Sequence, residues 1–383
     1  MIRRLVTTPS VIALSLALVA TACGGSSTPS PAAGTPAGAT PTGAAGTPVA
    51  ASQTAPAASA LAATPKASAS ATPAFSPQPG ELTLVAYSTP KAAYDAIIPL
   101  FQATPAGQGV QFESSYGASG DQSRAVEAGL PADVVAFSLA PDITRLVKDG
   151  MVASTWNSNQ YKGMVTDSVV VFVVRKGNPK GIKTWDDLVK PGIGVVEPNP
   201  FTSGGARWNV IAAYGAQIKQ GKTEDQAVAY LTALFKNVVS QDSSARAALQ
   251  TFVAGQGDVM LAYENEAIAA QQGGQDVDYI VPDQTILIEN PVAITNVGDV
   301  PDKAKAFVDY LITPDAQNAY ASKGYRPIVP AVASQYAAQF PQPSGLFTIN
   351  DLGLGGWDTV TTKFFDKTNG IVAKIEEGIG VQP

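Results

Sequence analysis

Hydroxyl side chains and glycines gather at four points where an apolar, β-rich segment gives way to a helical one. The four turns are Tyr87-Ser88-Thr89-Pro90, Gly117-Ala118-Ser119-Gly120, Phe201-Thr202-Ser203-Gly204-Gly205 and Gln241-Asp242-Ser243-Ser244-Ala245-Arg246. Serine hydroxyls donate hydrogen bonds, and a helix N-terminus presents unpaired N–H groups with about half a positive charge. Glycine lets an anion approach the backbone closely. If the turns converge, they form an anion site that needs no lysine or arginine.

Capping is the simpler explanation for most of these turns taken singly. Serine and threonine are ordinary N-caps of helices, so one such residue before a helix does not indicate a site. The Ser203-Gly204-Gly205 turn is different, because two glycines in a first helical turn each cost roughly 1 kcal/mol relative to alanine. Capping does not require that cost, so this turn predicts a binding function.

Missing residue types exclude several kinds of chemistry. The sequence contains no histidine and a single cysteine, Cys23. Without histidine there is no Ser-His-Asp triad, no Cys-His dyad and no His-ligated metal. One cysteine forms neither an internal disulfide nor a Cys-rich zinc site. We therefore expect no metal and no cofactor, and a function that rests on hydroxyls, carboxylates, amines or backbone groups.

Two enzymatic alternatives remain open at this level. Ser88-Thr89-Pro90-Lys91 matches the Ser-x-x-Lys pattern of penicillin-binding enzymes, although the companion Lys-Thr-Gly and Ser-Asp-Asn motifs are missing. Glu264 and Glu266 are spaced like the paired carboxylates of a glycosidase. A secreted serine hydrolase is thus the alternative function. A binding protein, in contrast, would perform no catalysis.

The first 80 residues are expected to direct and tether the protein. Arg3 and Arg4 precede an apolar stretch, 11–20, that is too short to span a bilayer, so 1–22 is interpreted as a signal peptide. The run Ala20-Thr21-Ala22-Cys23 resembles a bacterial lipobox, which implies a lipid on Cys23 and an extracytoplasmic protein anchored to the cell membrane, on its periplasmic or outer face. Residues 23–80 are almost wholly Ala, Pro, Thr, Ser and Gly, a composition typical of a disordered tether.

From Glu81 onward, β-rich runs alternate with helical patterns. Strands are predicted at 82–87, 110–114, 133–137, 168–175, 193–197, 238–240, 259–263 and 285–289, and helices at 91–102, 121–128, 185–189, 204–219, 226–235, 245–253, 303–312 and 315–322. This alternation indicates an α/β fold, in which ligands bind beyond the carboxyl ends of the strands. The segment 81–383 is too long for one compact sheet, so we expect two lobes with a crevice between them.

The charge of the folded part excludes two classes of partner. Removing Arg3, Arg4 and Lys66 from the 25 basic residues leaves 22 against 31 acidic ones, a net charge of −9 for 81–383. No basic patch is present for nucleic acid, and the acidic balance argues against a phospholipid-headgroup surface.

Residues 81 to about 365 resemble the bacterial sulfate-binding proteins, the extracytoplasmic receptors of sulfate/thiosulfate ABC importers. The segments that carry the resemblance are SYGASGDQS at 115–123, ADVVAFSLAPDI at 132–143, VVFVVRKGNPKGIKTWDDLVKPG at 170–192, EPNPFTSGGARWN at 197–209, GDVMLAYENEA at 257–267, GYRPIVPAV at 324–332 and LFTINDLGLGGW at 346–357. The resemblance implies a two-lobed periplasmic-binding-protein fold of type II, with the ligand in the cleft between the lobes. Lobe 1 would comprise 81–166 plus 267–325, and lobe 2 167–266 plus 326–383. It also implies a monomer that hands its anion to the membrane permease subunits of an ABC transporter.

The resemblance also implies which residues bind the anion. These are Ser88, Ser119, Ser203, Gly204, Gly205, Ala245 and Tyr263. Ser119 would donate its hydroxyl, Ser203 its hydroxyl and N–H, and the two glycines and Ala245 their N–H groups. Ser88 stands where the family often has an aspartate that gives its N–H. Tyr263 stands where the family often has a tryptophan, and its phenol can also donate a hydrogen bond.

Donors without an acceptor favour an anion that carries no proton, such as sulfate. Hydrogenphosphate carries one proton and would need an acceptor, which Asp121 or Asp242 beside two of the turns could supply. Thiosulfate, molybdate and phosphate therefore remain alternative ligands. Arg207 and Arg246 are expected to support the binding loops. Tryptophans are expected to pack in the core, namely Trp185, Trp208 and Trp357.

Overall fold

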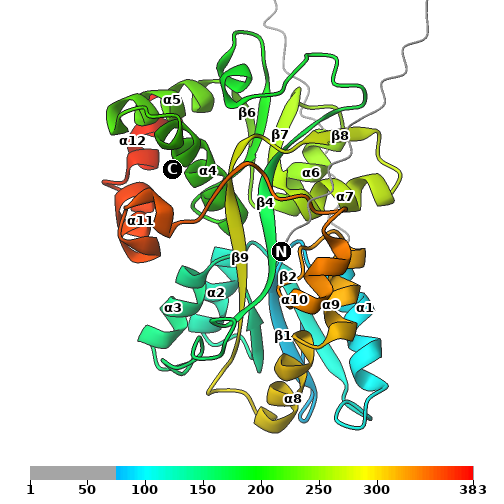
Figure 1. The fold of residues 1–383 in the computed structure, drawn as a ribbon. Helices are drawn as coiled ribbons and strands as arrows, with labels where there is room; N and C mark the ends of the chain where they lie inside the picture. Colours follow the sequence, from blue (N-terminus) through cyan, green and yellow to red (C-terminus); the bar gives the residue numbers. More distant parts are fainter. Residues whose placement is uncertain (1–74, 383) are drawn as a thin grey trace, which may run out of the picture. The chain divides into compact units, whose positions relative to one another are not determined.

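A computed structural model describes residues 75–382 of the chain. The predicted signal peptide, Cys23 and nearly all of the predicted tether lie outside these residues. The strands, shown in Figure 1, are β1 Leu82–Tyr87, β2 Phe112–Gly117, β3 Val134–Ala136, β4 Met164–Arg175, β5 Val195–Pro198, β6 Val238–Asp242, β7 Val259–Tyr263, β8 Val277–Ile280, β9 Gln284–Ile294 and β10 Gly345–Phe347.

Helices separate most of these strands. They are α1 Lys91–Gln102, α2 Ser119–Glu127, α3 Ala140–Lys148, α4 Gly204–Lys219, α5 Glu224–Lys236, α6 Ala245–Val253, α7 Glu264–Gln272, α8 Pro301–Leu311, α9 Pro314–Ser322, α10 Pro330–Ala333, α11 Gly356–Phe365 and α12 Ile371–Gly378, with 3₁₀ turns η1 Trp185–Val189, η2 Ser334–Tyr336 and η3 Asn350–Leu352. None of the helices within 75–382 has both the length and the apolarity that a membrane span requires.

The strands form one mixed sheet that extends through two lobes. Its order is β2-β1-β3-β9-β4-β7-β5-β6, with β8 paired to β4 and β10 to β9. Parallel pairing joins β1 to β2 and β3 in the first lobe, and β5 to β6 and β7 in the second. The long antiparallel pair β4 and β9 connects the two sets of strands (Figure 1). Two α/β lobes linked by crossover strands confirm the predicted fold class.

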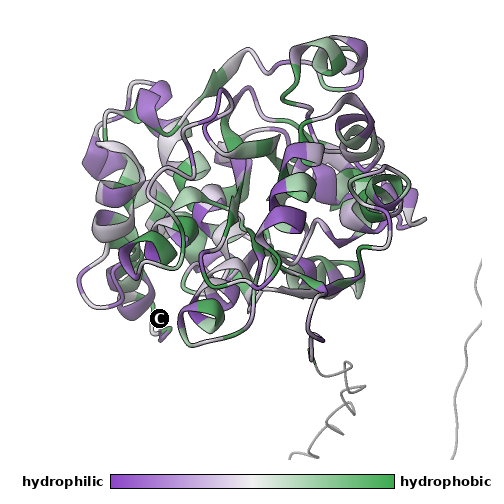
Figure 2. Cartoon of the chain, turned by 90° about the horizontal axis from the view of Figure 1, so that it is seen from below, coloured by the Kyte–Doolittle hydropathy of each residue, from purple (hydrophilic) through white to green (hydrophobic). Residues whose placement is uncertain are grey.

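Helices cover both faces of the sheet in each lobe, so the inner strands are apolar on both sides. In β1, Leu82, Leu84 and Ala86 pack with α1, α8 and α9, whereas Val85 faces the cluster that includes α2 and α3. In β4, alternate residues likewise face α4 and α5 on one side and α6 and α7 on the other. Hydrophobic residues accordingly lie along the inner strands, with hydrophilic ones outward (Figure 2). Strands buried on both faces are typical of parallel sheets.

The sequence predicted most of the elements that have a strong local pattern. Helices α1, α4 and α6 and strands β1 and β7 have the predicted bounds, and the helix predicted from Asp121 begins earlier, at Ser119. Helices α3, α7, α10, α11 and α12 and strands β8 and β10 were not predicted. Strand β9 is longer than the strand expected at 285–289, and β2 lies later than the strand expected at 110–114. Helix α7 was missed because Glu264 follows β7 without a single turn residue between strand and helix.

Helix α4 lies inside the molecule, where its backbone closely approaches a later segment. Apart from its C-terminal turn, its residues are buried, which fits a sequence without a polar face. A Cβ on Gly215 would lie 2.5 Å from Cε2 of Phe347 and 3.0 Å from Leu352. Glycine at this position therefore permits the contact between α4 and the strand β10.

We predict that Gly215→Ala destabilises the fold by up to about 2 kcal/mol in urea unfolding. The gain in helix propensity, about 1 kcal/mol, is smaller than the usual 1–3 kcal/mol cost of overpacking a core. Phe347→Leu removes the ring that the new methyl would meet. The cost of Gly215→Ala should therefore be smaller in a Phe347→Leu background, and an equal cost in both backgrounds would contradict this assignment.

Candidate functional site

The four serine-containing turns converge on one small cavity between the lobes. Every residue predicted to bind the anion lines it, together with three residues that were not predicted. The lining is Tyr87, Ser88, Thr89, Ser119, Ser138, Ser203, Gly204, Gly205, Ala245 and Tyr263. The first lobe supplies the residues after β1 and β3 and at the start of α2. The second lobe supplies the first residues of α4 and α6 and the end of β7.

Three helices begin at the cavity, and local hydrogen bonds fix where two of them start. The Ser203 hydroxyl oxygen accepts from the Ala206 N–H at 3.4 Å and caps α4. The Ser244 hydroxyl oxygen caps α6 in the same way, accepting from Ala247 at 3.2 Å. Helix α2 begins at Ser119 after an extended residue, Ala118. Each of these helices therefore presents the positive end of its dipole at the cavity.

Several backbone N–H groups of the lining lack an acceptor within residues 75–382. These belong to Ser88, Ser119, Gly204, Gly205 and Ala245. All except that of Ser88 lie in the first turn of a helix, where no carbonyl of the same helix can reach them. Buried N–H groups are nearly always paired in folded proteins. A set of unpaired donors around one cavity is therefore suited to hold an anion.

Two groups that were predicted as donors are occupied in this structure. The Ser203 N–H donates to the Asn199 carbonyl at 2.8 Å, so only its hydroxyl hydrogen remains free. The Ser119 hydroxyl donates to Oδ2 of Asp142 at 2.6 Å and accepts from the Ser138 N–H at 3.0 Å. Ser119 therefore offers its N–H to the cavity in place of its hydroxyl.

The carboxylates that were expected beside the turns point away from the cavity. Asp121 is exposed and pairs with Arg124. Asp242 accepts from the hydroxyls of Ser240 and Thr251, each at 2.9 Å. The carboxylate nearest to the lining is that of Asp142, which is buried and separated from the cavity by the Ser119 hydroxyl. The lining itself holds no carboxylate and no cation.

Ser138 is one of the three lining residues that the sequence analysis did not predict, together with Tyr87 and Thr89. Its hydroxyl lies 2.5 Å from the hydroxyl of Tyr263, and the two residues come from opposite lobes. The available signal was a fifth strand–serine–helix junction, Phe137-Ser138-Leu139-Ala140-Pro141. Proline near a helix start is common, and here Pro141 lies in the first turn of α3. Because 140–148 was not predicted to be helical, this junction was not grouped with the other four.

Burial favours the uncharged forms of several ionisable groups around the cavity. It raises the pKa of Tyr87 and of Tyr263 well above the usual value, so both phenols carry their protons. It also raises the pKa of Glu197 well above its usual value, and that of Glu266, just behind Tyr263, to about 7. Arg246 partly opposes the shift at Glu266. These carboxyls add little negative charge at pH 6.

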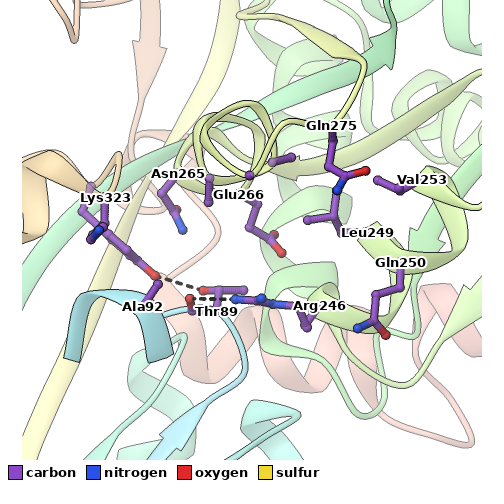
Figure 3. A pocket seen from close by; sticks show the side chains of 14 residues that line it. Thr89, Ala92, Arg246, Leu249, Gln250, Val253, Asn265, Glu266, Gln275 and Lys323 are labelled. Atoms are coloured by element: carbon purple, nitrogen blue, oxygen red, sulfur yellow. Dashed lines mark hydrogen bonds between the residues drawn. The ribbon is translucent and has the colours of Figure 1, made fainter. Parts of the chain in front are cut away.

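Thr89 separates the small cavity from a larger pocket. The small cavity measures about 10 Å³, near the minimum for one water molecule, and the larger pocket about 260 Å³. Figure 3 shows this pocket, with Arg246 and Glu266 from α6 and α7 opposite Thr89. The Arg246 guanidinium reaches the Thr89 carbonyl across the lobes at 3.5 Å.

The lobes are closed against each other at the cavity. The Gly120 N–H donates to the Thr202 carbonyl at 3.0 Å across the cleft. A Cβ on Gly204 would lie 2.3 Å from Leu139 and 2.7 Å from Cβ of Ser138. The backbone of α4 therefore meets the first lobe so closely that only glycine fits. A tetrahedral anion is larger than water, so the lobes must part to admit it and then close around it.

The remaining candidates have structural roles. Arg207 is buried and donates from Nε to the Pro200 carbonyl at 3.0 Å, which supports the loop before α4. Glu264 pairs with Arg326, its Oε2 at 2.7 Å from Nε. The tryptophans pack as predicted: Trp208 stacks edge-on against Trp357, and Trp185 packs against Phe172.

Comparison with known proteins agrees with this description. The family model described as "Bacterial extracellular solute-binding protein" matches residues 82–326. The sulfate-binding protein of Synechococcus elongatus is 46% identical and covers 75% of this chain and 84% of its own. That of Escherichia coli is 39% identical, covering 74% and 90%. A thiosulfate-binding protein of Pseudomonas aeruginosa is 35% identical, covering 74% and 88%.

Solved structures show the same fold. The sulfate-binding protein SubI from Mycobacterium tuberculosis H37Rv superposes with a TM-score of 0.73 at 46% identity, covering 75% of this chain and 99% of its own. A periplasmic thiamin binding protein, at 16% identity and a TM-score of 0.58, shares the fold alone. The match to the family model and the extent and identity of these relatives show that the chain belongs to the bacterial extracellular solute-binding proteins.

Proposed function

We propose that the protein binds sulfate in the cavity between its lobes, outside the cytoplasmic membrane, and delivers it to an ABC-type permease. The observation that carries this proposal is the gathering of unpaired N–H groups from three helix starts around a cavity lined by no cation and no carboxylate. The relatives named as sulfate-binding proteins support it. Thiosulfate is a second candidate ligand, supported by the relative from Pseudomonas aeruginosa that is named as a thiosulfate-binding protein.

The donor set suits a fully ionised tetrahedral oxyanion. Five N–H groups and the Ser203 hydroxyl can each donate one hydrogen bond to the anion. A hydrogen bond to a charged group contributes about 1.5–3 kcal/mol, so six offset much of the anion's desolvation and leave micromolar binding, near −8 kcal/mol. The proton of hydrogenphosphate would point at one of these donors, which is unfavourable. The site thus favours sulfate because no carboxylate in the lining can accept the proton of hydrogenphosphate.

Capture requires no catalysis and follows from closure of the lobes. Both lobes contribute donors, so the anion stabilises the closed state that it completes. In this proposal lobe 1 comprises 81–166 plus 267–325 and lobe 2 comprises 167–266 plus 326–383. The receptor acts as a monomer, and the closed pair of lobes is the form that the permease receives.

Calorimetric titration at pH 6 and 8 tests the ligand and the closure together. Sulfate should bind with micromolar affinity at both pH values, and phosphate and molybdate at least tenfold more weakly. Gly204→Ala should weaken sulfate binding tenfold or more, because its methyl group would overlap Leu139 and Ser138 when the lobes close. The control is Gly378→Ala, whose methyl group would meet nothing within 4 Å. Equal affinities for sulfate and phosphate would contradict the assignment.

A further prediction concerns the pH dependence of sulfate binding. Glu266 has a pKa of about 7 and lies behind Tyr263, so it is neutral at pH 6 and negative at pH 8. A new negative charge there opposes a dianion by about 1 kcal/mol, and sulfate should bind about fivefold more weakly at pH 8 than at pH 6. Glu266→Gln should remove this dependence.

Asp167 supplies the control for that experiment. Its pKa is also raised to about 7, mainly by burial, but it lies on β4 away from the cavity lining. Because both carboxyls bind protons more tightly folded than unfolded, their contribution to stability is present below pH 4 and is lost as pH rises to about 7, by roughly 3–4 kcal/mol each. Asp167→Asn should flatten the pH dependence of stability and leave that of sulfate binding unchanged. The opposite result would show that Glu266 does not act on the anion.

We propose further that Cys23 carries a lipid that anchors the receptor to the membrane. The support is the run Ala20-Thr21-Ala22-Cys23 after a short apolar stretch, followed by a long Ala/Pro/Thr/Ser/Gly segment. In a bacterial host that processes lipoproteins, the full chain should fractionate with membranes, and Cys23→Ser should release it without changing sulfate affinity. A Cys23→Ser chain that stays with membranes would refute the anchor.

A further inference from the structure

Ser138 occupies a position in the cavity that its backbone fixes completely. Its N–H donates to the Ser119 hydroxyl oxygen at 3.0 Å. Its carbonyl accepts from Nε1 of Trp208 at 2.9 Å and from Nδ2 of Asn290 at 3.1 Å. The residue is 1% exposed. These bonds leave its hydroxyl as the one adjustable group, and that group lies in the cavity lining 2.5 Å from the Tyr263 hydroxyl.

The two hydroxyls hold two hydrogens between them, and one of these is used in their mutual bond. A phenol is a stronger acid than an aliphatic alcohol, so Tyr263 is the better donor and Ser138 the better acceptor. The hydrogen of Ser138 is then the one left free. Because a serine hydroxyl rotates about its own bond, this hydrogen can turn toward a ligand in the cavity.

The surroundings of Ser138 place that hydrogen among the other donors. The start of α4 is packed directly against Ser138, since a Cβ on Gly204 would lie 2.7 Å from the Ser138 hydroxyl oxygen. The unpaired N–H groups of Gly204 and Gly205 belong to the same helix start. An oxygen atom that accepts from these N–H groups therefore lies beside the serine hydroxyl.

We propose that Ser138 donates its hydroxyl hydrogen directly to the bound sulfate, and that Tyr263 acts through Ser138 as a positioning residue. This inference rests on the proposed function of the cavity. A donor that itself accepts a hydrogen bond is polarised by it, so the order Tyr263 to Ser138 to anion strengthens the last bond. The first lobe thus supplies the donor for this side of the anion, and the second lobe orients it.

The test is a double-mutant cycle of Ser138→Ala and Tyr263→Phe, measured by calorimetric titration with sulfate. Ser138→Ala keeps the backbone bonds of residue 138 and loses the donor, so we expect binding at least tenfold weaker. Tyr263→Phe leaves Ser138 able to donate, and we expect a loss of threefold or less. In the double variant, affinity should equal that of Ser138→Ala alone, because the proposal has Tyr263 act on the anion only through Ser138.

Each of the other outcomes contradicts a specific part of the proposal for Ser138 and Tyr263. A larger loss from Tyr263→Phe than from Ser138→Ala would make the phenol the direct donor. Additive losses in the double variant would reduce Tyr263 to a structural role. Unchanged affinity in Ser138→Ala, with wild-type protein that binds sulfate, would refute this proposal and leave the proposed function standing. Wild-type protein that binds no sulfate would refute both.

Discussion

The structure depends on one electrostatic constraint: a helix cannot satisfy the N–H groups of its own first turn. Helices α2, α4 and α6 all begin at the same cavity, so their unpaired N–H groups face a common space. Water satisfies such groups at ordinary helix ends, but between closed lobes little room for water remains. An anion with several oxygens satisfies many of them at once. Neutral dipoles in a dry site thereby replace the lysine or arginine that a surface site would use.

Closure of the lobes and binding of the anion both require the backbones of the two lobes to approach closely. The Gly120 N–H reaches the Thr202 carbonyl, and Gly204 allows α4 to approach Ser138 and Leu139. A side chain larger than hydrogen at Gly204 would hold the lobes apart and leave the helix starts exposed to water. Gly204, costly for helix formation, is thus explained by its close approach to the first lobe, whereas a Cβ on Gly205 would make only ordinary contacts at 3.5 Å or more.

Sequence reasoning identified the parts of the site that have local signatures. The turns at Ser119, Ser203 and Ala245 combine a small or hydroxyl residue with a helix start, and the fold brings all of them to one cavity. Sequence reasoning could not show that the Ser203 N–H and the Ser119 hydroxyl already have hydrogen-bond partners. Those partners are the Asn199 carbonyl and the Asp142 carboxyl group. Asp142 lies 23 residues from Ser119, and no local pattern connects them. The same limit applies to β4 and β9, whose antiparallel pairing is non-local.

A chain of hydrogen bonds with an assigned direction runs through the site. The Ser119 hydroxyl donates its hydrogen to Oδ2 of Asp142. The Ser119 oxygen can then only accept, and it accepts the N–H of Ser138. This bond fixes Ser138 in the wall, where its hydroxyl meets Tyr263. The buried Asp142, which does not line the cavity, therefore determines which of these hydroxyls are donors.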